Sequence, residues 1–358
     1  MKILFLYRYG ILGGVCTQLF HRFRYLSEDS NIELHCGFRS DHGVREMLEP
    51  YATLHFGLNK ESTVQFLNEN VFDKIIIIDS EEYLEAIKKV DIQSTVIVEV
   101  HTSIERNLEY LSRIDKDQVD KFVTVSRYMM GRVCHHVKFN VKKEEILRFQ
   151  NVLDSEIFKP HKLETTGPPV VVWVGKIDDH KDWRSFLNIS SLIHAEDDSV
   201  EFWIVGGQTC PETRASEVFD YAEEKGIISR FRWFDRIENV NMPLLYSLVA
   251  KRGGINLVTS HCESFGMSVL ESLLTGCPVI STDVGALPEI TEQSNYYKLY
   301  QLGDHVSAAN HCLASLSGSS EARANLFASR EDLVNLYDSG LRSKEYWSLL
   351  ETIGESNV

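Results

Sequence analysis

The chain lacks long apolar runs and paired cysteines. Its longest apolar runs, such as residues 75–78, have the length of a strand, whereas a membrane-spanning helix needs about 20 apolar residues. Seven cysteines are scattered and none forms a C-x-x-C pair, which favours reduced thiols over a disulfide framework or a zinc site. The first apolar segment, KILFLY, is too short for a signal peptide and is followed by Arg8. We therefore expect a cytoplasmic protein.

The chain is also poor in positive charge, with 37 Lys and Arg residues against 52 Asp and Glu, and a net charge of −15. This balance argues against nucleic acid as a partner. A basic stretch at residues 121–148 is the exception, and apolar residues such as Met129 and Val133 interleave with its cations. Such a stretch is usually a solvated helix face. The alternative is peripheral contact with anionic lipid at the inner face of the membrane, or with an anionic acceptor.

Apolar strand-like segments alternate with helical stretches along the whole chain. The first half contains KILFLY, IELHCGF, KIIIIDS, TVIVEVH and KFVTVS, and the second half contains VVVWVGK, VEFWIVGG, RFRWFD, INLVTS and CPVISTD. Two successive βαβ series predict an α/β fold with two doubly wound parallel sheets. We place the hinge at TTGPP, so that the domains cover residues 1–164 and 165–342. Because parallel sheets bind ligands at the carboxyl ends of their strands, we expect the site in a cleft between two facing sheets.

The segment HCESFGMSVLESLLTGCPVISTDVGALPEI, residues 261–290, is the most informative part of the chain. Its pattern predicts a loop, a helix from about Gly266 to Gly276, a buried strand and a second loop. A helix N-terminus offers unpaired amides to a phosphate. Glu263 precedes that N-terminus, and Glu271 lies about one turn inside the helix, where a carboxylate suits the hydroxyls of a sugar or ribose. Taken alone, two solvated glutamates are the commoner interpretation.

The same segment closely resembles the donor-site signature of family 4 retaining glycosyltransferases (glycosyl transferases group 1), which share the GT-B fold of two Rossmann-like domains. In that family, two glutamates are separated by seven residues. They are followed by the entry to a strand, with the pattern small-Gly-x-Pro-Val, and then by a Gly-x-Pro-Glu turn. The matching residues here are Glu263, Glu271, Gly276, Pro278, Val279, Gly285, Pro288 and Glu289. Ser264 and Ser268 depart from the usual Gly and Pro. The resemblance implies an acceptor-side first domain, a donor-binding second domain, and a last helix, about 343–358, that returns to the first domain.

Two further loops carry candidate phosphate contacts. Gly13 and Gly14 follow the first strand, and although a lone Gly-Gly is usually a tight turn, its position resembles the glycine loop that contacts the donor phosphates. Lys176 and Lys181 follow the first strand of the second domain, where two cations can neutralise a departing diphosphate as Mg²⁺ does elsewhere. The family usually has Arg and Lys-Gly here, so Lys176 replaces the Arg and Asp182 replaces the Gly.

His101 ends the apolar segment TVIVEVH. A histidine at such a position is more often a hydrogen-bonded residue at the core edge, but the family places a His here beside the donor sugar. We therefore expect His101 to act as a positioning and electrostatic residue near the anomeric carbon. Ile237, in the loop after RFRWFD, corresponds to the loop whose backbone pairs with the donor base. The segment AKRGG at 250–254 departs from the family pattern and marks an insertion or an altered loop.

The resemblance implies a retaining, metal-independent glycosyltransferase without a cofactor. It would move a hexosyl group from a nucleotide sugar, a UDP-sugar rather than GDP-mannose, to a glycan, glycolipid or other acceptor in polysaccharide or glycoconjugate biosynthesis. Glu263 would bind the sugar hydroxyls and Glu271 the ribose. The diphosphate would be held by the two lysines and by the loop residues Gly13, Gly14, Ser264, Phe265, Gly266 and Met267. A UDP-sugar epimerase of the same architecture and a catalytically silent sugar-nucleotide-binding subunit are the alternatives.

Overall fold

The computed structural model describes the chain except for residues 116, 138–144, 208–209, 292–296, 318–329 and 354–358. The chain divides into two compact units. Unit 1 comprises Met1–Asp154 and Tyr337–Val358, and unit 2 comprises Ser155–Leu336. The sequence placed the boundaries after residues 164 and 342. Part of the predicted basic stretch, including Lys138, Lys142 and Lys143, lies outside the described residues.

Unit 1 is built on a parallel sheet with the strand order β5-β3-β1-β6-β7-β8-β9 among the described residues. Its strands are β1 (Lys2–Tyr7), β3 (Glu33–Gly37), β5 (Thr53–His55), β6 (Lys74–Ile78), β7 (Thr95–Val100), β8 (Lys121–Thr124) and β9 (Ile146–Arg148). A short pair, β2 (Tyr9–Ile11) and β4 (Ser40–His42), lies beside it. The helices are α1 (Gly14–Leu26), α2 (Arg45–Leu48), α3 (Lys60–Glu69), α4 (Glu81–Ile87), α5 (Arg127–Val137) and α13 (Ser339–Thr352), with 3₁₀ turns η1 (Glu105–Asn107) and η2 (Glu109–Arg113).

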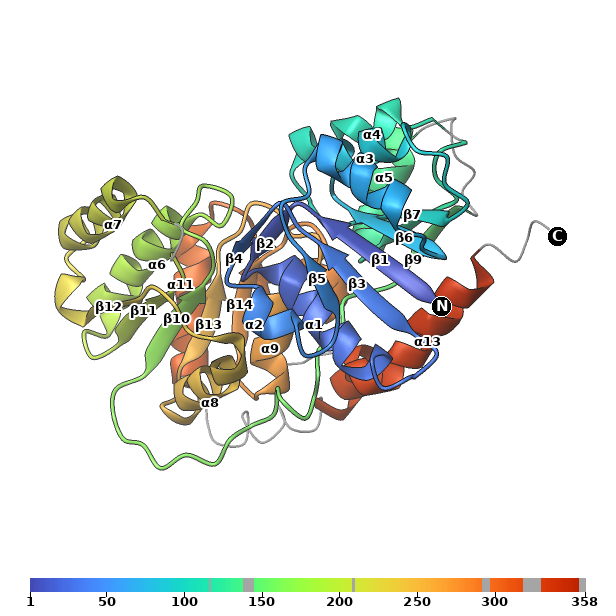
Figure 1. The fold of residues 1–358 in the computed structure, drawn as a ribbon. Helices are drawn as coiled ribbons and strands as arrows, with labels where there is room; N and C mark the ends of the chain where they lie inside the picture. Colours follow the sequence, from blue (N-terminus) through green and yellow to red (C-terminus); the bar gives the residue numbers. More distant parts are fainter. Residues whose placement is uncertain (116, 138–144, 208–209, 292–296, 318–329, 354–358) are drawn as a thin grey trace. The chain divides into compact units, whose positions relative to one another are not determined.

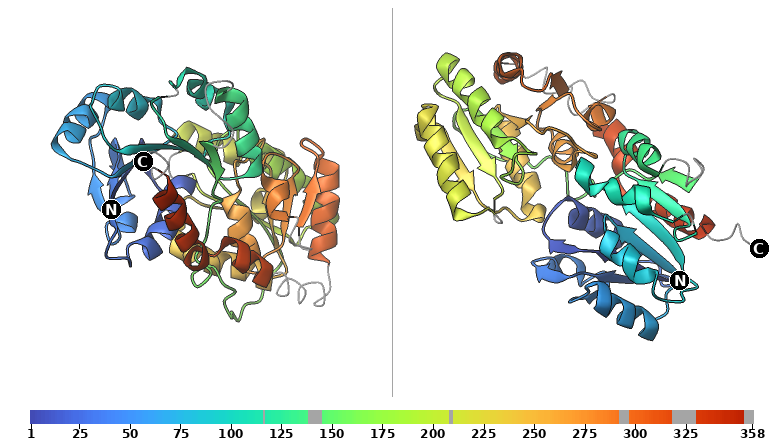
Figure 2. Two further views of the ribbon diagram at one scale, coloured as in Figure 1. Left: turned by 90° about the vertical axis from the view of Figure 1, so that its right-hand side faces the viewer. Right: turned by 90° about the horizontal axis from the view of Figure 1, so that it is seen from above.

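Helices cover both faces of this sheet, with α3, α4 and α5 on one face and α1 and α13 on the other (Figure 1). This coverage explains why KIIII of β6 is buried throughout, because a strand covered on both faces needs an unbroken apolar run. The last helix is tied into the unit at its N-terminal end. The Leu153 amide donates to the Tyr337 carbonyl and the Ser339 amide donates to the Leu153 carbonyl, on either side of Asp338, which caps α13 by accepting from the amide of Leu341. Figure 2 shows this red helix against the blue elements of unit 1.

Unit 2 holds a second parallel sheet, ordered β12-β11-β10-β13-β14-β15 in the part of the chain that the structure describes. Its strands are β10 (Val170–Val174), β11 (Glu201–Val205), β12 (Phe231–Phe234), β13 (Ile255–Val258), β14 (Val279–Thr282) and β15 (Tyr297–Tyr300). The helices are α6 (Trp183–Glu196), α7 (Glu212–Glu224), α8 (Met242–Lys251), α9 (Met267–Leu274), α10 (Leu287–Thr291) and α11 (His305–Leu316), with η5 (Ile228–Arg230) and η6 (Asn239–Asn241). Its core includes Trp173, Trp183 and Phe186.

The predicted fold class is confirmed, since every predicted strand segment contains a strand and both sheets are parallel α/β structures. The short strands β2, β4, β5, β9 and β15 were not predicted. All seven cysteines lie among the described residues and none forms a disulfide bond. Within the described ranges, no helix has the length and apolar character needed to span a membrane.

The unusual AKRGG segment forms the end of α8 and the turn into β13. Arg252 donates a 2.8 Å hydrogen bond from Nε to the Pro168 carbonyl and forms a 3.2 Å ion pair with Glu201 at the start of β11. Its guanidinium also stacks 5.3 Å from the centre of the Trp203 ring. Arg252 of this segment therefore holds the chain in place where it enters β10, at the amino edge of the sheet.

Candidate functional site

The carboxyl ends of β10 and β13, which are neighbours in the sheet, bring Lys181 and Glu263 together. Lys181 Nζ donates to Glu263 Oε1 at 2.5 Å, and Ser260 Oγ donates to the same oxygen at 2.7 Å. Gly285 fixes the backbone beneath them, since a Cβ there would lie 2.3 Å from the Glu263 carbonyl oxygen and its φ is +57°. Two residues 82 positions apart, which the sequence predicted for one donor site, thus form one ion pair.

Glu263 is buried and ionised. Burial opposes its negative charge, but the nearby Lys181 ammonium and the hydrogen bonds from Lys181 and Ser260 outweigh burial and lower the pKa of Glu263. An ionised carboxylate only accepts hydrogen bonds. Oε1 takes both bonds described above, and Oε2 accepts none from the described residues. Oε2 is therefore suited to a ligand hydroxyl.

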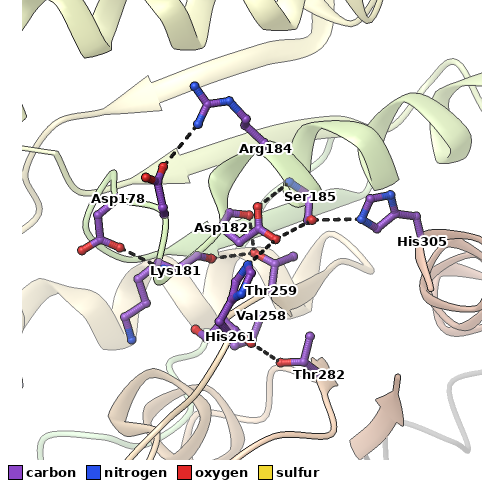
Figure 3. Close-up of polar contacts among 12 residues, drawn as sticks. Asp178, Lys181, Asp182, Arg184, Ser185, Val258, Thr259, His261, Thr282 and His305 are labelled. Atoms are coloured by element: carbon purple, nitrogen blue, oxygen red, sulfur yellow. Dashed lines mark hydrogen bonds and ion pairs between the residues drawn. The ribbon is translucent and has the colours of Figure 1, made fainter. Parts of the chain in front are cut away.

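Asp182, which replaces the usual glycine, shapes the loop that carries Lys181 (Figure 3). Its φ of +53° lies in the left-handed region that glycine favours and that aspartate tolerates. Its carboxylate caps α6, since Oδ1 accepts from the Ser185 amide at 3.1 Å and Oδ2 from the Ser185 hydroxyl at 2.6 Å. Thr259 Oγ1 lies 2.8 Å from the carbonyl oxygens of both Lys181 and Asp182. Asp182 therefore adopts a backbone conformation that glycine favours and also caps α6.

Two histidines that the sequence analysis did not select lie beside this loop. His261 Nε2 is 3.1 Å from Asp182 Oδ2, and the His261 amide donates to the His180 carbonyl at 2.9 Å. The pKa of His180 is lowered because burial and the Lys181 charge both disfavour its protonation. The position of His261 two residues before Glu263 was the available signal, but that position alone does not show that the side chain turns toward Asp182.

Helix α9 begins where the pattern predicted. Its N-cap, Gly266, has a φ of +108°, and a Cβ there would lie 2.5 Å from a Leu287 methyl group, so only glycine fits without displacement. Among the described residues, no side chain of the N-cap position caps this N-terminus. Phe265 is buried, and Ser264 and Met267 are half-buried beside it. The N-terminus of α9 therefore has the geometry of an anion-binding site.

Glu271 lies inside α9 and is 6% exposed, so the solvated-glutamate interpretation fails for both carboxylates. Burial raises the pKa of Glu271 to about 7, against the smaller opposing effect of hydrogen bonds from Tyr246 and Asn239. The Tyr246 hydroxyl lies 3.3 Å from Glu271 Oε2. A buried carboxylate with so few donors is incompletely compensated, and ligand hydroxyls would supply the missing hydrogen bonds.

The other residues predicted for unit 2 lie in loops after strands. Lys176 is exposed after β10 and has no ion pair within the described part of the chain, in contrast to Lys181. Ile237 is half-buried in the loop after β12. No group of three or more His, Cys, Asp or Glu side chains is arranged to hold a metal ion among the described residues.

In unit 1, Gly13 is the N-cap of α1 with an extended backbone, φ −166°, and no side chain of the part of the chain that the structure describes caps the helix. A Cβ built on Gly14 would meet nothing within 4 Å. The two glycines are therefore not required by backbone strain or by packing. Open space at the start of α1 is what close approach of a phosphate needs.

His101 follows β7 and is buried. Its amide donates to Asp79 Oδ1 at 2.9 Å, and its ring Nε2 lies 3.0 Å from Glu99 Oε2. Asp79 itself has a φ of +44°, which is uncommon for a residue other than glycine and is often found at functional sites. Sequence reasoning selected His101 but missed Asp79 and Glu99, whose contacts depend on the pairing of β6 with β7.

Comparisons with known proteins find similarity in sequence and in fold. The family described as glycosyl transferases group 1 matches residues 168–317. A 2-deoxystreptamine N-acetyl-D-glucosaminyltransferase of Niallia circulans is 24% identical over 49% of this chain and 43% of its own length. A D-inositol 3-phosphate glycosyltransferase of Corynebacterium glutamicum is 25% identical over 48% and 43%. The chain thus matches less than half the length of these curated relatives.

Among solved structures, HepE of Anabaena in complex with UDP and glucose superposes with a TM-score of 0.83 at 16% identity, over 98% of this chain and all of that one. TarM superposes with a TM-score of 0.78 at 10% identity, over 98% of each chain. At these identities the likeness concerns the fold. Residues 168–317 therefore match the glycosyl transferases group 1 family, and the chain as a whole has the GT-B fold.

Proposed function

We propose that this protein is a retaining, metal-independent glycosyltransferase that moves a hexosyl group from a UDP-sugar to a glycan or glycolipid. The observation that carries the proposal is the Lys181–Glu263 pair at the carboxyl ends of β10 and β13, beside the uncapped N-terminus of α9. Parallel sheets bind ligands at this edge, and the pair offers a cation for a diphosphate and a carboxylate for a sugar.

In unit 2, this proposal assigns the diphosphate to Lys181, Lys176 and the amides at the start of α9. In unit 1, it assigns a phosphate contact to Gly14. Glu263 accepts hydroxyl hydrogen bonds from the transferred sugar through Oε2. Glu271 accepts hydrogen bonds from the ribose, which would satisfy its buried carboxylate. The loop around Ile237 pairs with the base. His101 acts on the transferred sugar as a positioning and electrostatic residue.

The chemistry follows from this arrangement. As the bond between the anomeric carbon and the diphosphate breaks, negative charge grows on the leaving group, and the lysines and helix amides stabilise it. An acceptor hydroxyl that attacks from the same face, with its proton passing to the departing diphosphate oxygen, preserves the anomeric configuration. Glu263 is not assigned as a nucleophile, because in this proposal Oε1 is held by Lys181 and Ser260 and Oε2 accepts a hydrogen bond from a hydroxyl of the transferred sugar.

Several findings support a UDP-sugar as donor and a glycoconjugate as product. HepE was solved with UDP and glucose, and the Niallia circulans relative is named as an N-acetylglucosaminyltransferase. We propose the basic residues of α5, together with the rest of the 121–148 stretch, as the place where a membrane-bound acceptor would approach.

The test is to incubate the protein separately with UDP-glucose, UDP-N-acetylglucosamine and GDP-mannose and to follow free nucleotide and sugar. Slow release of UDP, lost in Lys181→Met, supports the transferase. Interconversion of the sugars would instead identify an epimerase, and binding without turnover a silent subunit. Failure to bind any of the three donors would overturn the proposal.

A further inference from the structure

A charged residue lies in the middle of an apolar strand of unit 1. Glu99 belongs to β7, TVIVEV, and is completely buried. A central parallel strand covered by helices normally consists of apolar residues, because an ionised carboxylate there must be fully compensated. Alternate residues of a strand share a face, so Glu99 and His101 point the same way. The one buried acid of this strand is thus placed beside the predicted catalytic histidine.

Donors from three separate parts of the chain converge on Glu99. Arg22 Nη1 of α1 lies 3.0 Å from Oε1 and 2.9 Å from Oε2. The Tyr346 hydroxyl of α13 donates to Oε1, and His101 Nε2 lies 3.0 Å from Oε2. The Arg22 guanidinium is also stacked 4.4 Å from the centre of the Tyr346 ring. Both carboxylate oxygens are engaged, and the last helix of the chain closes the arrangement.

These contacts determine how the His101 ring is held. Burial opposes the charge of Glu99, but Arg22 and the hydrogen bonds from His101 and Tyr346 prevail and lower the pKa of Glu99 to about 2. Glu99 is therefore an ionised, acceptor-only group at neutral pH. The ring nitrogen that faces it, Nε2, must carry the proton. Nδ1 is then the nitrogen left for a substrate.

Stability alone is a weak explanation of this arrangement. Buried ion pairs can often be replaced by apolar residues without loss of stability. Moreover, the buried Nε and Nη2 of Arg22 have no hydrogen-bond partner among the described residues, so the pair is not fully satisfied. What the cluster supplies, and an apolar cluster would not, is a fixed orientation and tautomer for His101.

We propose that Glu99 is a positioning residue of the transferase, which fixes His101 as the Nε2–H tautomer and presents Nδ1 to the donor sugar. Arg22 and Tyr346 hold Glu99 in place, so α13, which carries Tyr346, helps to position His101. This inference rests on the proposed function for its kinetic consequence, whereas the tautomer itself can be measured without any activity.

The chain offers a matched control in unit 2. Glu201 of β11 is also buried, pairs with Arg252 at 3.2 Å, and accepts a hydrogen bond at 3.0 Å from the ring of Trp203, two residues later. It reproduces the Glu–Arg–ring arrangement without a histidine. Glu201→Gln therefore measures the general cost of neutralising such a glutamate.

The experiment measures the ring ¹⁵N signals of His101 in the full-length protein, assigned by their absence in His101→Gln, together with steady-state kinetics. In the wild type we expect only the Nε2–H tautomer. Glu99→Gln should give a mixture of tautomers and a kcat lowered about 10–100-fold, with the KM for the donor changed by less than about twofold. Glu201→Gln should leave both readouts unchanged.

Glu99→Asp covers the case in which Glu99→Gln does not fold, because it keeps the charge for Arg22 while withdrawing the carboxylate from the ring. It should also give mixed tautomers. An unchanged Nε2–H signal in these variants, or a protonated Nδ1 in the neutral wild-type ring, would overturn the inference while the proposed function stands. Absence of all donor turnover in the wild type would instead count against the proposed function, and the tautomer measurement would still decide the role of Glu99.

Discussion

Glu99 and Glu201 have similar surroundings, but Glu99 lies near the carboxyl edge of the sheet in unit 1 and Glu201 at the amino edge of the sheet in unit 2. Each is a buried glutamate on a parallel strand, paired with an arginine and hydrogen-bonded to the ring of the residue two positions later. Glu99 lies next to the carboxyl end of β7, whereas Glu201 is the first residue of β11. The carboxyl edge is where parallel sheets bind ligands, and the amino edge here only fastens the chain entering β10. The edge, more than the local contacts, decides what such a cluster can do.

The largest expected effect tests how much each cluster contributes to stability. Glu99→Ala leaves Arg22 buried without its counter-charge, so we expect the free energy of unfolding to fall by about 3–5 kcal/mol. Glu201→Ala should cost only about 1–2 kcal/mol, because the Arg252 side chain is 11% exposed, against 1% for Arg22, and keeps its hydrogen bond to the Pro168 carbonyl. The second ion-pair partner of Glu201, Arg232, is largely exposed to solvent. Urea denaturation of both variants measures the difference. Equal losses would show that the two clusters do not differ in burial as described.

The second prediction compares the two edges of unit 2 directly. Lys181→Met removes the cation that we propose beside the leaving group, and we expect kcat/KM for the UDP-sugar to fall by about 10²–10³-fold. Arg252→Met, at the amino edge, should lower the melting temperature but change kcat/KM by less than about twofold. Comparable kinetic losses in the two variants would remove the distinction between the edges.

The third prediction uses the opposite pKa shifts of the two donor-site glutamates. The pKa of Glu271 is raised from about 4.5 to about 7, so the folded state binds more protons than the unfolded state between these values. Stability should therefore decrease by about 3 kcal/mol as pH rises through this window, and Glu271→Gln should abolish that decrease. For Glu263, whose pKa is lowered, the contribution is present above about pH 4.5 and is lost as pH falls below it. Thermal unfolding from about pH 3 to pH 8 decides whether the signs differ.

The smallest expected effect is a change in UDP affinity caused by a substitution at the carboxyl edge of the sheet in unit 1. Gly14→Ala adds a methyl group where nothing lies within 4 Å, so the fold should tolerate it. If the Gly14 amide contacts the diphosphate, UDP should bind about tenfold more weakly, as calorimetry would show. Gly131→Ala in α5 has equally open surroundings and is the control, with unchanged affinity expected. Unchanged affinity in Gly14→Ala as well would exclude this contact.

The sequence predicted the features that local pattern determines. Apolar segments such as KIIII located the strands, and the 261–290 segment located α9 and the two glutamates. The sequence could not show whether Glu263 and Glu271 are buried or solvated. The surroundings of Glu271, for example, include Tyr246, which lies 25 positions away. The sequence assigned Lys181 and Glu263 to one donor site only through the family resemblance. Their ion pair depends on the order of the strands in the sheet, which the structure shows.

What the sequence did not reveal depends on contacts between distant residues. Glu99 is a single acid within an apolar run, and its partners come from positions 22 and 346. Nothing in the neighbourhood of any one of these residues indicates the other two. Likewise, the sequence shows only that Asp182 stands where the family usually has Gly, and its left-handed φ and its capping hydrogen bonds are visible only in the structure.

A crystal structure of the protein with UDP tests the central claim most directly. The account predicts the diphosphate within hydrogen-bond distance, about 3 Å, of Lys181 Nζ and the first amides of α9, with the ribose hydroxyls on Glu271. UDP bound at the amino edge beside Arg252, or bound without contact to Lys181, would contradict it.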